Sequence, residues 1–380
     1  MVVKLLAVIG TRPEAIKMAP LLALLRDEAT VELRLCLSGQ HCGLLDPALR
    51  LFGLEADLDL ALMAPGQGLN GLAGKALQRL DSVLADEAPD RVLVHGDTTT
   101  ALAAALAAFH RSIPVAHVEA GLRTGDLARP FPEEMNRRAI DLVADLLFAP
   151  TQRARRNLET ERAAGRIVVT GNTGVDAVEA ILGRLGADDA LRGEADAALP
   201  APAPGKRLLL VTGHRRESFG EGLRSVCAAL RALGGRGDLD IVYPVHLNPE
   251  VKAPVEEALG GCDNVRLLPP LDFLPMVRLM QRADLILTDS GGIQEEAPSL
   301  GKRVLVTRDV TERPEGVACG KALLVGTDAE RIVAAVSELL DDEAAAGRFR
   351  GGGNPYGDGR ASRRIGDALL GRPFEEFEEP

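Results

Sequence analysis

Several features that mark common classes of protein are missing from this 380-residue chain. Tryptophan is absent and aromatic residues make up only 3%, which argues against a lectin surface that stacks sugars on aromatic rings. The net charge is −11 and no Lys/Arg tract or aromatic ladder occurs, so nucleic acid is not an expected partner. No apolar run approaches the length needed to span a membrane, and the N-terminus has no signal-peptide layout.

Cysteine is scarce and scattered. Its five residues are odd in number and include no CxxC pair: Cys36, Cys42, Cys227, Cys262 and Cys319. This usage predicts free thiols in a reducing cytoplasm and gives no indication of a zinc site.

The motifs of several cofactor classes are also missing. No GxGxxG follows an expected strand, so a nicotinamide cofactor is not predicted. GxxxxGK[ST] is absent, which excludes a P-loop enzyme, and so are GxSxG and any cluster of metal ligands. We therefore expect neither a cofactor nor a metal.

The first half of the chain alternates apolar strands with helices. With 46% hydrophobic residues and a mean hydropathy near zero, the chain can bury large cores, and its length suits two domains. Strands are expected at Lys4–Ile9, Val31–Leu37, Arg91–Val94, Val115–Val118 and Leu146–Ala149. Helices are expected at 13–25, 69–86, 101–110 and 133–143. Such alternation indicates a doubly wound parallel sheet.

The alternation restarts after Val169, beyond which the Ala/Pro/Gly-rich stretch 186–206 is expected to be an exposed surface segment. Further strands are expected at Leu208–Thr212, Asp240–Tyr243, Val265–Leu267, Leu285–Leu287 and Val304–Val306. We predict an α/β fold of two facing Rossmann-like doubly wound domains with an active-site cleft between them. The N-terminal domain would comprise residues 1–171 plus 360–380, including a terminal helix at about 358–370 that crosses back, and the C-terminal domain residues 172–359.

The stretch 284–298 combines a short strand, a sharp turn and a helix. Ser290 would cap that helix, while Gly291 and Gly292 would let the backbone approach a ligand closely. The exposed N–H groups and the helix dipole would then suit a phosphate. Glu296 would lie roughly 9 Å further along the axis, within reach of a ribose.

Acidic residues follow the expected strands of the first half. Asp97 could either cap the next helix or serve catalysis, and Glu119, which precedes Ala-Gly, favours a functional role. Glu133 and Glu134 could be first-turn acids that match a helix dipole. The two arginines that follow them, Arg137 and Arg138, could be ordinary surface charges.

Cations and histidines complete the set of candidates. Lys17 is expected near the carboxyl edge of the first strand, and phosphate binding needs arginines at several points: Arg12, Arg215 and Arg313. His214 has arginines beside it, which favours contact with an anion over a plain loop position. His246, between Val and Leu, is the weaker of the two candidates.

Ten motifs occur in a characteristic order between residues 4 and 370. They are Gly10–Pro20, His95–Thr100, His117–Gly125, Phe131–Arg137, Thr170–Thr173, Gly213–Glu217, Tyr243–Pro249, Thr288–Gly301, Thr311–Glu315 and Asn354–Asp358. In these motifs the chain closely resembles the bacterial non-hydrolysing UDP-N-acetylglucosamine 2-epimerases. That resemblance implies glycosyltransferase-B architecture, usually as a homodimer. It also implies interconversion of UDP-N-acetylglucosamine and UDP-N-acetylmannosamine without metal or nicotinamide.

The resemblance also implies roles for particular residues. The catalytic group would be Lys17, Asp97, Glu119, Glu133 and His214. UDP would be bound by Arg12, Arg215, Phe273, Ser290, Gly291, Gly292, Glu296 and Arg313. Some family members are activated by UDP-N-acetylglucosamine at a second site, for which the corresponding residues would be Gln40, Glu134, Arg215 and His246.

The resemblance leaves open which carboxylate removes the C2 proton. A UDP-sugar-dependent glycosyltransferase of the same fold is the nearest alternative, although nothing in the sequence requires an acceptor site. A hydrolysing epimerase usually carries an added kinase domain, for which the chain has no room, and a non-enzymatic sensor would not need the five catalytic-type residues.

Overall fold

The computed structural model describes residues 2–39, 47–63, 66–213, 219–342, 344, 347, 349 and 352–380. The chain forms two compact units, each built on one parallel sheet. Unit 1 comprises Met1–Ala177 and Tyr356–Glu379, and unit 2 comprises Val178–Pro355 with Pro380. The predicted divisions lie after residues 171 and 359.

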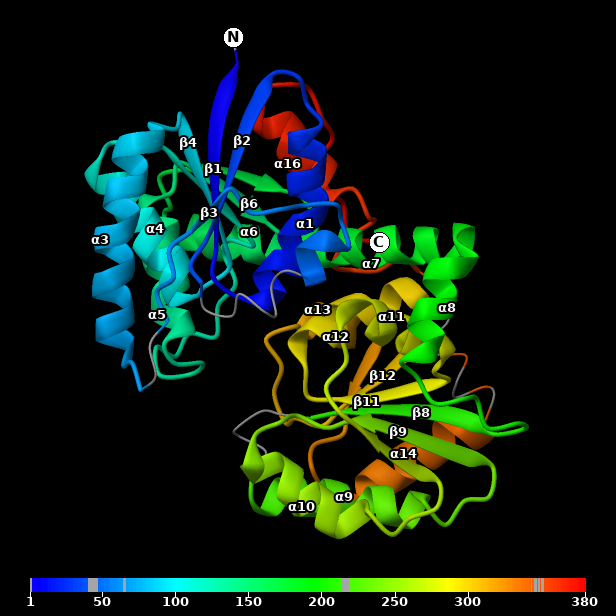
Figure 1. The fold of residues 1–380 in the computed structure, drawn as a ribbon. Coiled ribbons are helices and arrows are strands. Elements are labelled where there is room, and N and C mark those ends of the chain that lie inside the picture. The colour runs from blue at the N-terminus through cyan, green and yellow to red at the C-terminus, as the bar shows by residue number, and fades with distance from the viewer. Residues whose placement is uncertain are drawn as a thin grey trace. The chain divides into compact units, whose positions relative to one another are not determined.

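Unit 1 contains a seven-stranded parallel sheet in the order β3-β2-β1-β4-β5-β6-β7 (Figure 1). Its strands are β1 Val3–Ile9, β2 Val31–Leu37, β3 Leu58–Asp59, β4 Arg91–His95, β5 Val115–Val118, β6 Leu146–Ala149 and β7 Arg166–Val169. Its helices are α1 Arg12–Arg26, α3 Leu69–Glu87, α4 Thr99–His110, α5 Glu133–Val143, α6 Gln152–Thr160 and α16 Ala361–Leu369. Because β1 is an interior strand, third in this order, and the chain crosses over to both sides of it, the sheet is doubly wound.

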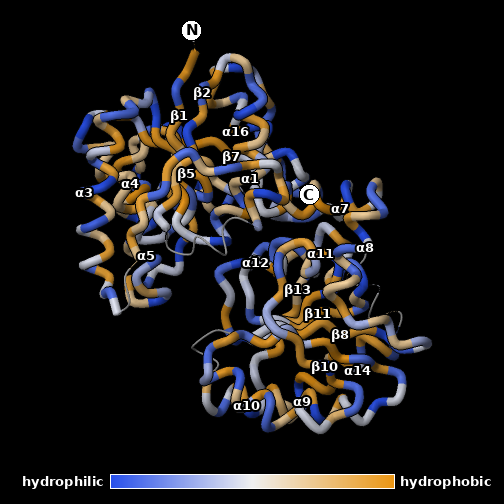
Figure 2. The backbone as a smooth tube through the Cα atoms, in the orientation of Figure 1, coloured by the Kyte–Doolittle hydropathy of each residue, from blue (hydrophilic) through white to orange (hydrophobic). Residues whose placement is uncertain are grey.

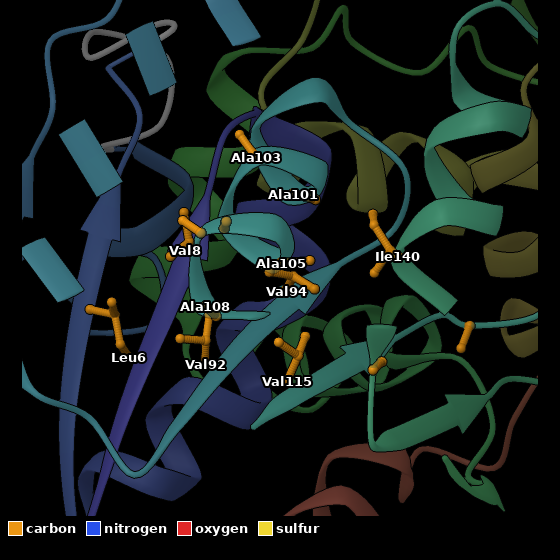
Figure 3. Close-up of a cluster of buried hydrophobic side chains, with 14 of the residues drawn as sticks. Leu6, Val8, Val92, Val94, Ala101, Ala103, Ala105, Ala108, Val115 and Ile140 are labelled. Carbon is orange, nitrogen blue, oxygen red and sulfur yellow. The ribbon is translucent and has the colours of Figure 1, made fainter. Parts of the chain in front are cut away.

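The pleat of β1 supplies two hydrophobic cores, one on each face of the sheet. Leu6 and Val8 join the core that α3, α4 and α5 cover, whereas Leu5, Ala7 and Ile9 join the core beneath α1 and α16. Figure 3 shows Leu6 and Val8 of β1 with alanines of α4, whose small side chains let helix and sheet approach closely. The strands of both sheets are mostly hydrophobic along their length (Figure 2), as strands buried on both faces are.

Unit 2 contains a six-stranded parallel sheet in the order β10-β9-β8-β11-β12-β13. Its strands are β8 Arg207–Thr212, β9 Leu239–Pro244, β10 Val265–Leu268, β11 Leu285–Thr288, β12 Arg303–Val306 and β13 Ala322–Leu324. Its helices are α8 Asp189–Ala197, α9 Glu221–Leu233, α10 Pro249–Leu259, α11 Phe273–Arg282, α12 Gly291–Glu296, a 3₁₀ turn at Ala297–Leu300, α13 Pro314–Ala318 and α14 Ala329–Asp341. Helix α7, Thr173–Ala187, carries the chain from one unit into the other.

The stretch 186–206 is mostly exposed, as predicted, but residues 189–197 within it form a helix, α8, that was not predicted. Asp188 caps this helix by accepting hydrogen bonds from the amides of Ala190 and Leu191. Leu191 and Ala195, one turn apart, bury the inner face. A good cap and helical apolar spacing therefore outweigh the Pro-rich composition, which affects only residues 200–204.

The C-terminal helix α16 packs beside α1 in unit 1 (Figure 1). It begins at Ala361, three residues later than predicted, where Asp176 accepts hydrogen bonds from the amides of Ala361 and Ser362 at 3.1 and 2.6 Å. A cap supplied by a residue 185 positions away in sequence leaves no local signal.

The predicted fold class, an α/β fold of doubly wound parallel sheets, is confirmed by these two sheets. Within the part of the chain that the structure describes, no helix combines the length and the apolarity needed to cross a bilayer.

Candidate active site

At the carboxyl edge of the unit 1 sheet, Lys17 and Glu119 form an ion pair. Lys17 lies on α1 and Glu119 directly follows β5, and the distance from Nζ to Oε2 is 2.5 Å. Asn172, from the turn after β7, donates its side-chain amide to the same Oε2 at 2.8 Å. Both side chains of the ion pair are 11% exposed, so the pair is shielded from most solvent screening.

Glu119 adopts a left-handed backbone conformation with φ of 69°. For a residue with a Cβ this costs on the order of 1–3 kcal/mol and persists only where the surroundings enforce it. Here the next amide, that of Ala120, is fixed by a hydrogen bond to the carbonyl of Phe148 at the end of β6. Such strain is concentrated at functional sites, because it aims a side chain that a regular strand end would direct elsewhere.

The second carboxylate of this edge, Asp97, is held by α5. Its Oδ2 lies 2.6 Å from Nη2 of Arg137, and its carbonyl accepts a hydrogen bond from Asn136 at 2.8 Å. The capping role considered for Asp97 falls instead to Thr98, whose hydroxyl accepts the amide of Ala101. Asp97 is therefore an ion-paired carboxylate at this edge, and the N-cap of α4 is Thr98.

Arg137 is not a surface charge, as the sequence analysis allowed, because it is only 5% exposed and pairs with Asp97. Arg138 is exposed and lies 3.4 Å from Glu161. Spacing to the acidic residues does not separate the two arginines, because each follows a glutamate by four positions. Arg137 instead shares a helix face with the buried Ile140, three positions further on.

The two glutamates that open α5 differ in their surroundings. Glu133 is half-buried at the first helical position, where the positive end of the helix dipole favours its charge. Glu134 is fully buried and accepts hydrogen bonds from the amides of Thr124 and Gly125 at 3.1 and 3.2 Å. Glu134 thus fastens the loop after β5 to α5.

Two polar residues that the sequence analysis did not select also lie at this edge. His95 ends β4 with its Nε2 4.0 Å from Glu119 Oε2, and neither of its ring nitrogens has a hydrogen-bond partner among the described residues. Burial lowers the pKa of His95 to about 4, although the charge of Glu119 partly opposes this. Glu14, on the first turn of α1, accepts hydrogen bonds from Gly10 and from the hydroxyl of Thr98. Both residues lie in the motifs Gly10–Pro20 and His95–Thr100, in which the family resemblance implies roles for other residues.

In unit 2 the turn after β11 brings several predicted residues together. A Cβ built on Gly291 would lie 2.8 Å from the guanidinium carbon of Arg313, and one on Gly292 would lie 3.2 Å from a carboxylate oxygen of Glu296. A side chain at Gly291 would therefore displace the guanidinium of Arg313 from this position against the backbone. Arg313 also donates from Nε to Glu295 at 2.9 Å. The turn thus presents a cation, a carboxylate and backbone amides within one small region.

The capping role predicted for Ser290 is wrong in one respect. Ser290 occupies the N-cap position of α12, but its hydroxyl makes no capping hydrogen bond with that helix. Its amide instead donates to the hydroxyl of Thr288 at 2.9 Å. Beside it, Asp289 lines a mostly apolar pocket that also includes Tyr243.

The remaining predicted residues are dispersed. Arg12 is half-buried at the start of α1, Phe273 is buried at the start of α11, and the exposed His246 accepts the amide of Asn248 on Nδ1. Three predicted residues lie outside the described residues: Gln40, His214 and Arg215. Among the residues described, no group of three or more His, Cys, Asp or Glu side chains is placed to hold a metal ion.

Fold and site together define a class. Two doubly wound parallel units, one with two ion-paired carboxylates at its sheet edge and one with a Ser-Gly-Gly turn, form the glycosyltransferase-B architecture found in nucleotide-sugar epimerase structures. The family model for UDP-N-acetylglucosamine 2-epimerase matches residues 23–370. This chain belongs to the UDP-N-acetylglucosamine 2-epimerase family. It is an enzyme, an isomerase of the epimerase class.

Individual relatives match along nearly the whole chain. The UDP-N-acetylglucosamine 2-epimerase of Escherichia coli K12 is 53% identical over 368 residues, which cover 96% of this chain and 98% of the relative. The crystal structure of the Neisseria meningitidis enzyme bound to UDP-GlcNAc superposes with a TM-score of 0.92 at 43% identity, covering 97% and 100% of the two chains. A Methanocaldococcus jannaschii enzyme in complex with UDP-GlcNAc and UDP gives a TM-score of 0.81 at 33% identity, covering 97% and 99%.

Proposed function

We propose that this isomerase interconverts UDP-N-acetylglucosamine and UDP-N-acetylmannosamine by inverting C2 of the sugar. The relatives named for this activity support the substrate, and two of the similar structures hold UDP-GlcNAc. The observation that carries the chemistry is the edge of the unit 1 sheet, where one ion-paired carboxylate follows β4 and another follows β5.

In the proposed mechanism a carboxylate removes the proton from C2 while the bond between C1 and the diphosphate oxygen breaks. The electron pair of the C2–H bond forms a C1–C2 double bond, and UDP leaves with the electrons of the C1–O bond. UDP then re-adds through oxygen to C1, and an acid returns a proton to the opposite face of C2. The sequence is redox-neutral, so it needs no nicotinamide.

The geometry favours Glu119 as one of the two proton-transfer groups. Its left-handed backbone and two anchors on Oε2, from Lys17 and Asn172, hold the carboxylate in one orientation. Such fixed placement is what general base catalysis requires. Asp97 and Glu133 would supply the acid on the other face, with His214 as the fifth member of the group.

We assign nucleotide binding to unit 2. Ser290, Gly291 and Gly292 would bind the diphosphate together with Arg313, and Glu296 would bind the ribose. The guanidinium packed on Gly291 supports this assignment, because departure of UDP develops negative charge that a fixed cation stabilises. Arg215 and Phe273 would complete the UDP site in unit 2, the arginine at phosphate and the aromatic ring near the uracil. Arg12, which begins α1 of unit 1, is proposed as a further phosphate contact.

Assembly as a homodimer is also part of the proposal. Phe131 and Leu142, which lie on or beside α5, are 70% and 77% exposed, and Met135 shares a helix face with Leu142. An apolar strip of this kind suits a protein interface. Light scattering would test it: a monomeric wild type would remove the dimer from the proposal. We further propose that the enzyme is cytoplasmic and supplies precursors for cell-surface polysaccharide.

The decisive experiment is incubation with UDP-N-acetylglucosamine alone in heavy water, followed by proton NMR. The proposal predicts a second UDP-sugar, deuterium at C2 in that product, and no net free UDP. Release of N-acetylmannosamine with UDP would indicate a hydrolysing enzyme. Absence of any reaction until a sugar acceptor is added would indicate a glycosyltransferase.

A further inference from the structure

Beneath the two carboxylate turns of unit 1 lies a buried pair, His117 of β5 and Asp141 of α5. His117 has no exposed surface. Its Nε2 lies 2.7 Å from the carbonyl oxygen of Gly96, and its Nδ1 lies 2.6 Å from Asp141 Oδ1. Asp141 Oδ2 in turn accepts the amide of Gly121 at 3.2 Å and the guanidinium of Arg123 at 2.7 Å.

Proton accounting shows that this pair holds one proton more than a neutral imidazole beside a carboxylate. A carbonyl oxygen can only accept, so Nε2 must donate to Gly96. The Nδ1–Asp141 bond of 2.6 Å also needs a hydrogen, and it must be carried by the ring or by the carboxyl group. Arg123 on the other oxygen of Asp141 favours the ionised carboxylate, which places the proton on the ring.

The charges that face the pair are consistent with an imidazolium. Burial alone would raise the pKa of Asp141, but His117 and Arg123 outweigh it and hold that pKa below its ordinary value. Arg123 is balanced by Glu161, 2.7 Å away at the end of α6. His95 on the neighbouring strand β4 has a pKa of about 4, lowered mainly by burial, and so adds no charge at neutral pH. The adjacent β6 contributes no titratable side chain.

The pair connects the two turns that carry the proposed catalytic carboxylates. Gly96 immediately precedes Asp97, and Gly121 comes two residues after Glu119. We propose that protonated His117, with Asp141, is a positioning device that holds the Asp97 and Glu119 turns in register, and that loss of its proton sets the alkaline limit of catalysis. If the ring lost that proton, the Nδ1 lone pair would face the Asp141 carboxylate. The resulting repulsion would oppose the ring position in which Nε2 donates its hydrogen bond to the carbonyl of Gly96.

The variant Asp141→Asn separates the proton from the hydrogen bonds. Its amide can donate to Nδ1 while its oxygen accepts from Gly121 and Arg123, so a neutral ring with hydrogen on Nε2 satisfies every partner. Volume and shape are conserved. The variant therefore keeps the connection between the two turns but has no proton to lose at alkaline pH.

The test compares kcat for UDP-N-acetylglucosamine against pH in the wild type and Asp141→Asn, and it rests on the proposed function. We expect wild-type kcat to fall by about tenfold per pH unit once the pair loses its proton, with KM little changed. This fall is the alkaline limb of the pH profile, and the variant should not show it. Identical alkaline limbs in the two proteins would overturn the proposal.

Nitrogen-15 NMR of the histidine rings in the wild type tests the same proton without turnover. We expect one of the six histidines to show both ring nitrogens protonated at neutral pH, and this signal to become a singly protonated ring in Asp141→Asn. A wild type with no doubly protonated ring at neutral pH would contradict the proposal, even if epimerase activity were confirmed. Conversely, the doubly protonated ring is expected even if epimerase activity proves absent, so the two proposals can fail separately.

Discussion

Glu14 provides a test of how burial competes with hydrogen bonding in this fold. Its carboxylate is buried in unit 1 and accepts hydrogen bonds from the amides of Gly10 and Thr11 and the hydroxyls of Thr11 and Thr98. Those bonds favour the ionised form, and burial opposes it. Burial wins, and the pKa of Glu14 rises from 4.5 to about 7.

A pKa that is raised in the folded state fixes the sign of the change in stability with pH. The native protein holds a proton on Glu14 more tightly than the unfolded chain does, so this group stabilises the fold below the unfolded pKa and loses that contribution as pH rises through 7. With a shift from 4.5 to about 7, the contribution lost between about pH 5.5 and about pH 8.5 is about 2 kcal/mol.

The perturbation is Glu14→Gln, which is isosteric and cannot ionise. Its oxygen can accept the two amides, and the hydroxyl of Thr98 can turn to accept from its NH₂ group. We expect the free energy of unfolding of the variant, minus that of the wild type, to increase by about 2 kcal/mol across that pH range. Urea unfolding of both proteins at several pH values measures this difference. Glu159→Gln, at an exposed position on α6, removes the same charge as a control.

Parallel pH profiles for Glu14→Gln and wild type would refute this reasoning. They would mean that the four donated hydrogen bonds fully offset the cost of burying the charge, so that Glu14 titrates alike in both states. A difference that shrinks with rising pH would be a stronger contradiction, because it requires a lowered pKa.

Three further predictions concern the site. Lys17→Met and Glu119→Gln should each lower kcat by at least about a hundredfold and leave UDP affinity within a few-fold of wild type. Because the two residues act as a unit, the double variant should be little worse than either single variant. Steady-state kinetics and UDP titration measure these effects, and additive losses of kcat would argue against a functional pair. Ser290→Ala and Glu296→Ala should each weaken UDP binding by about 1.5–3 kcal/mol in calorimetric titration, with unchanged affinity in both removing the nucleotide from this turn. If UDP-N-acetylglucosamine also activates the enzyme, the reaction started from UDP-N-acetylmannosamine alone should show a lag. A trace of UDP-N-acetylglucosamine should abolish that lag, and a progress curve that is linear from the start would exclude such activation.

The strands and the principal helices could be predicted because their signals are local. Within the predicted strand Lys4–Ile9 the run Leu5–Ile9 is apolar throughout, and the structure places β1 at Val3–Ile9, in the interior of its sheet. Helix α8 was missed because composition was weighed above the cap at Asp188. The start of α16 was set three residues early because its cap, Asp176, is distant in sequence.

For the site, too, the residues with local signals could be predicted and those placed by distant contacts could not. Lys17, Asp97 and Glu119 could be selected from their places after strands, but their partners could not. Asn172 reaches Glu119 across 53 positions, and Arg137 reaches Asp97 across 40 positions that include α4 and β5. Such pairings depend on how crossovers place strand ends beside one another, and a single sequence contains no record of that arrangement. The left-handed φ of Glu119 likewise has no sequence signal, because glutamate is an unfavourable residue for it.

The central claim is that UDP leaves C1 and returns. UDP-N-acetylglucosamine labelled with oxygen-18 in the bridge between C1 and phosphorus tests this directly, with phosphorus NMR following the label during turnover. Once UDP is expelled, its terminal phosphate can rotate, so the account predicts that the label scrambles from the bridge into non-bridging positions of the β-phosphate. Label that stays in the bridge through many epimerisation events would contradict elimination and re-addition, and would leave direct inversion at C2 as the mechanism.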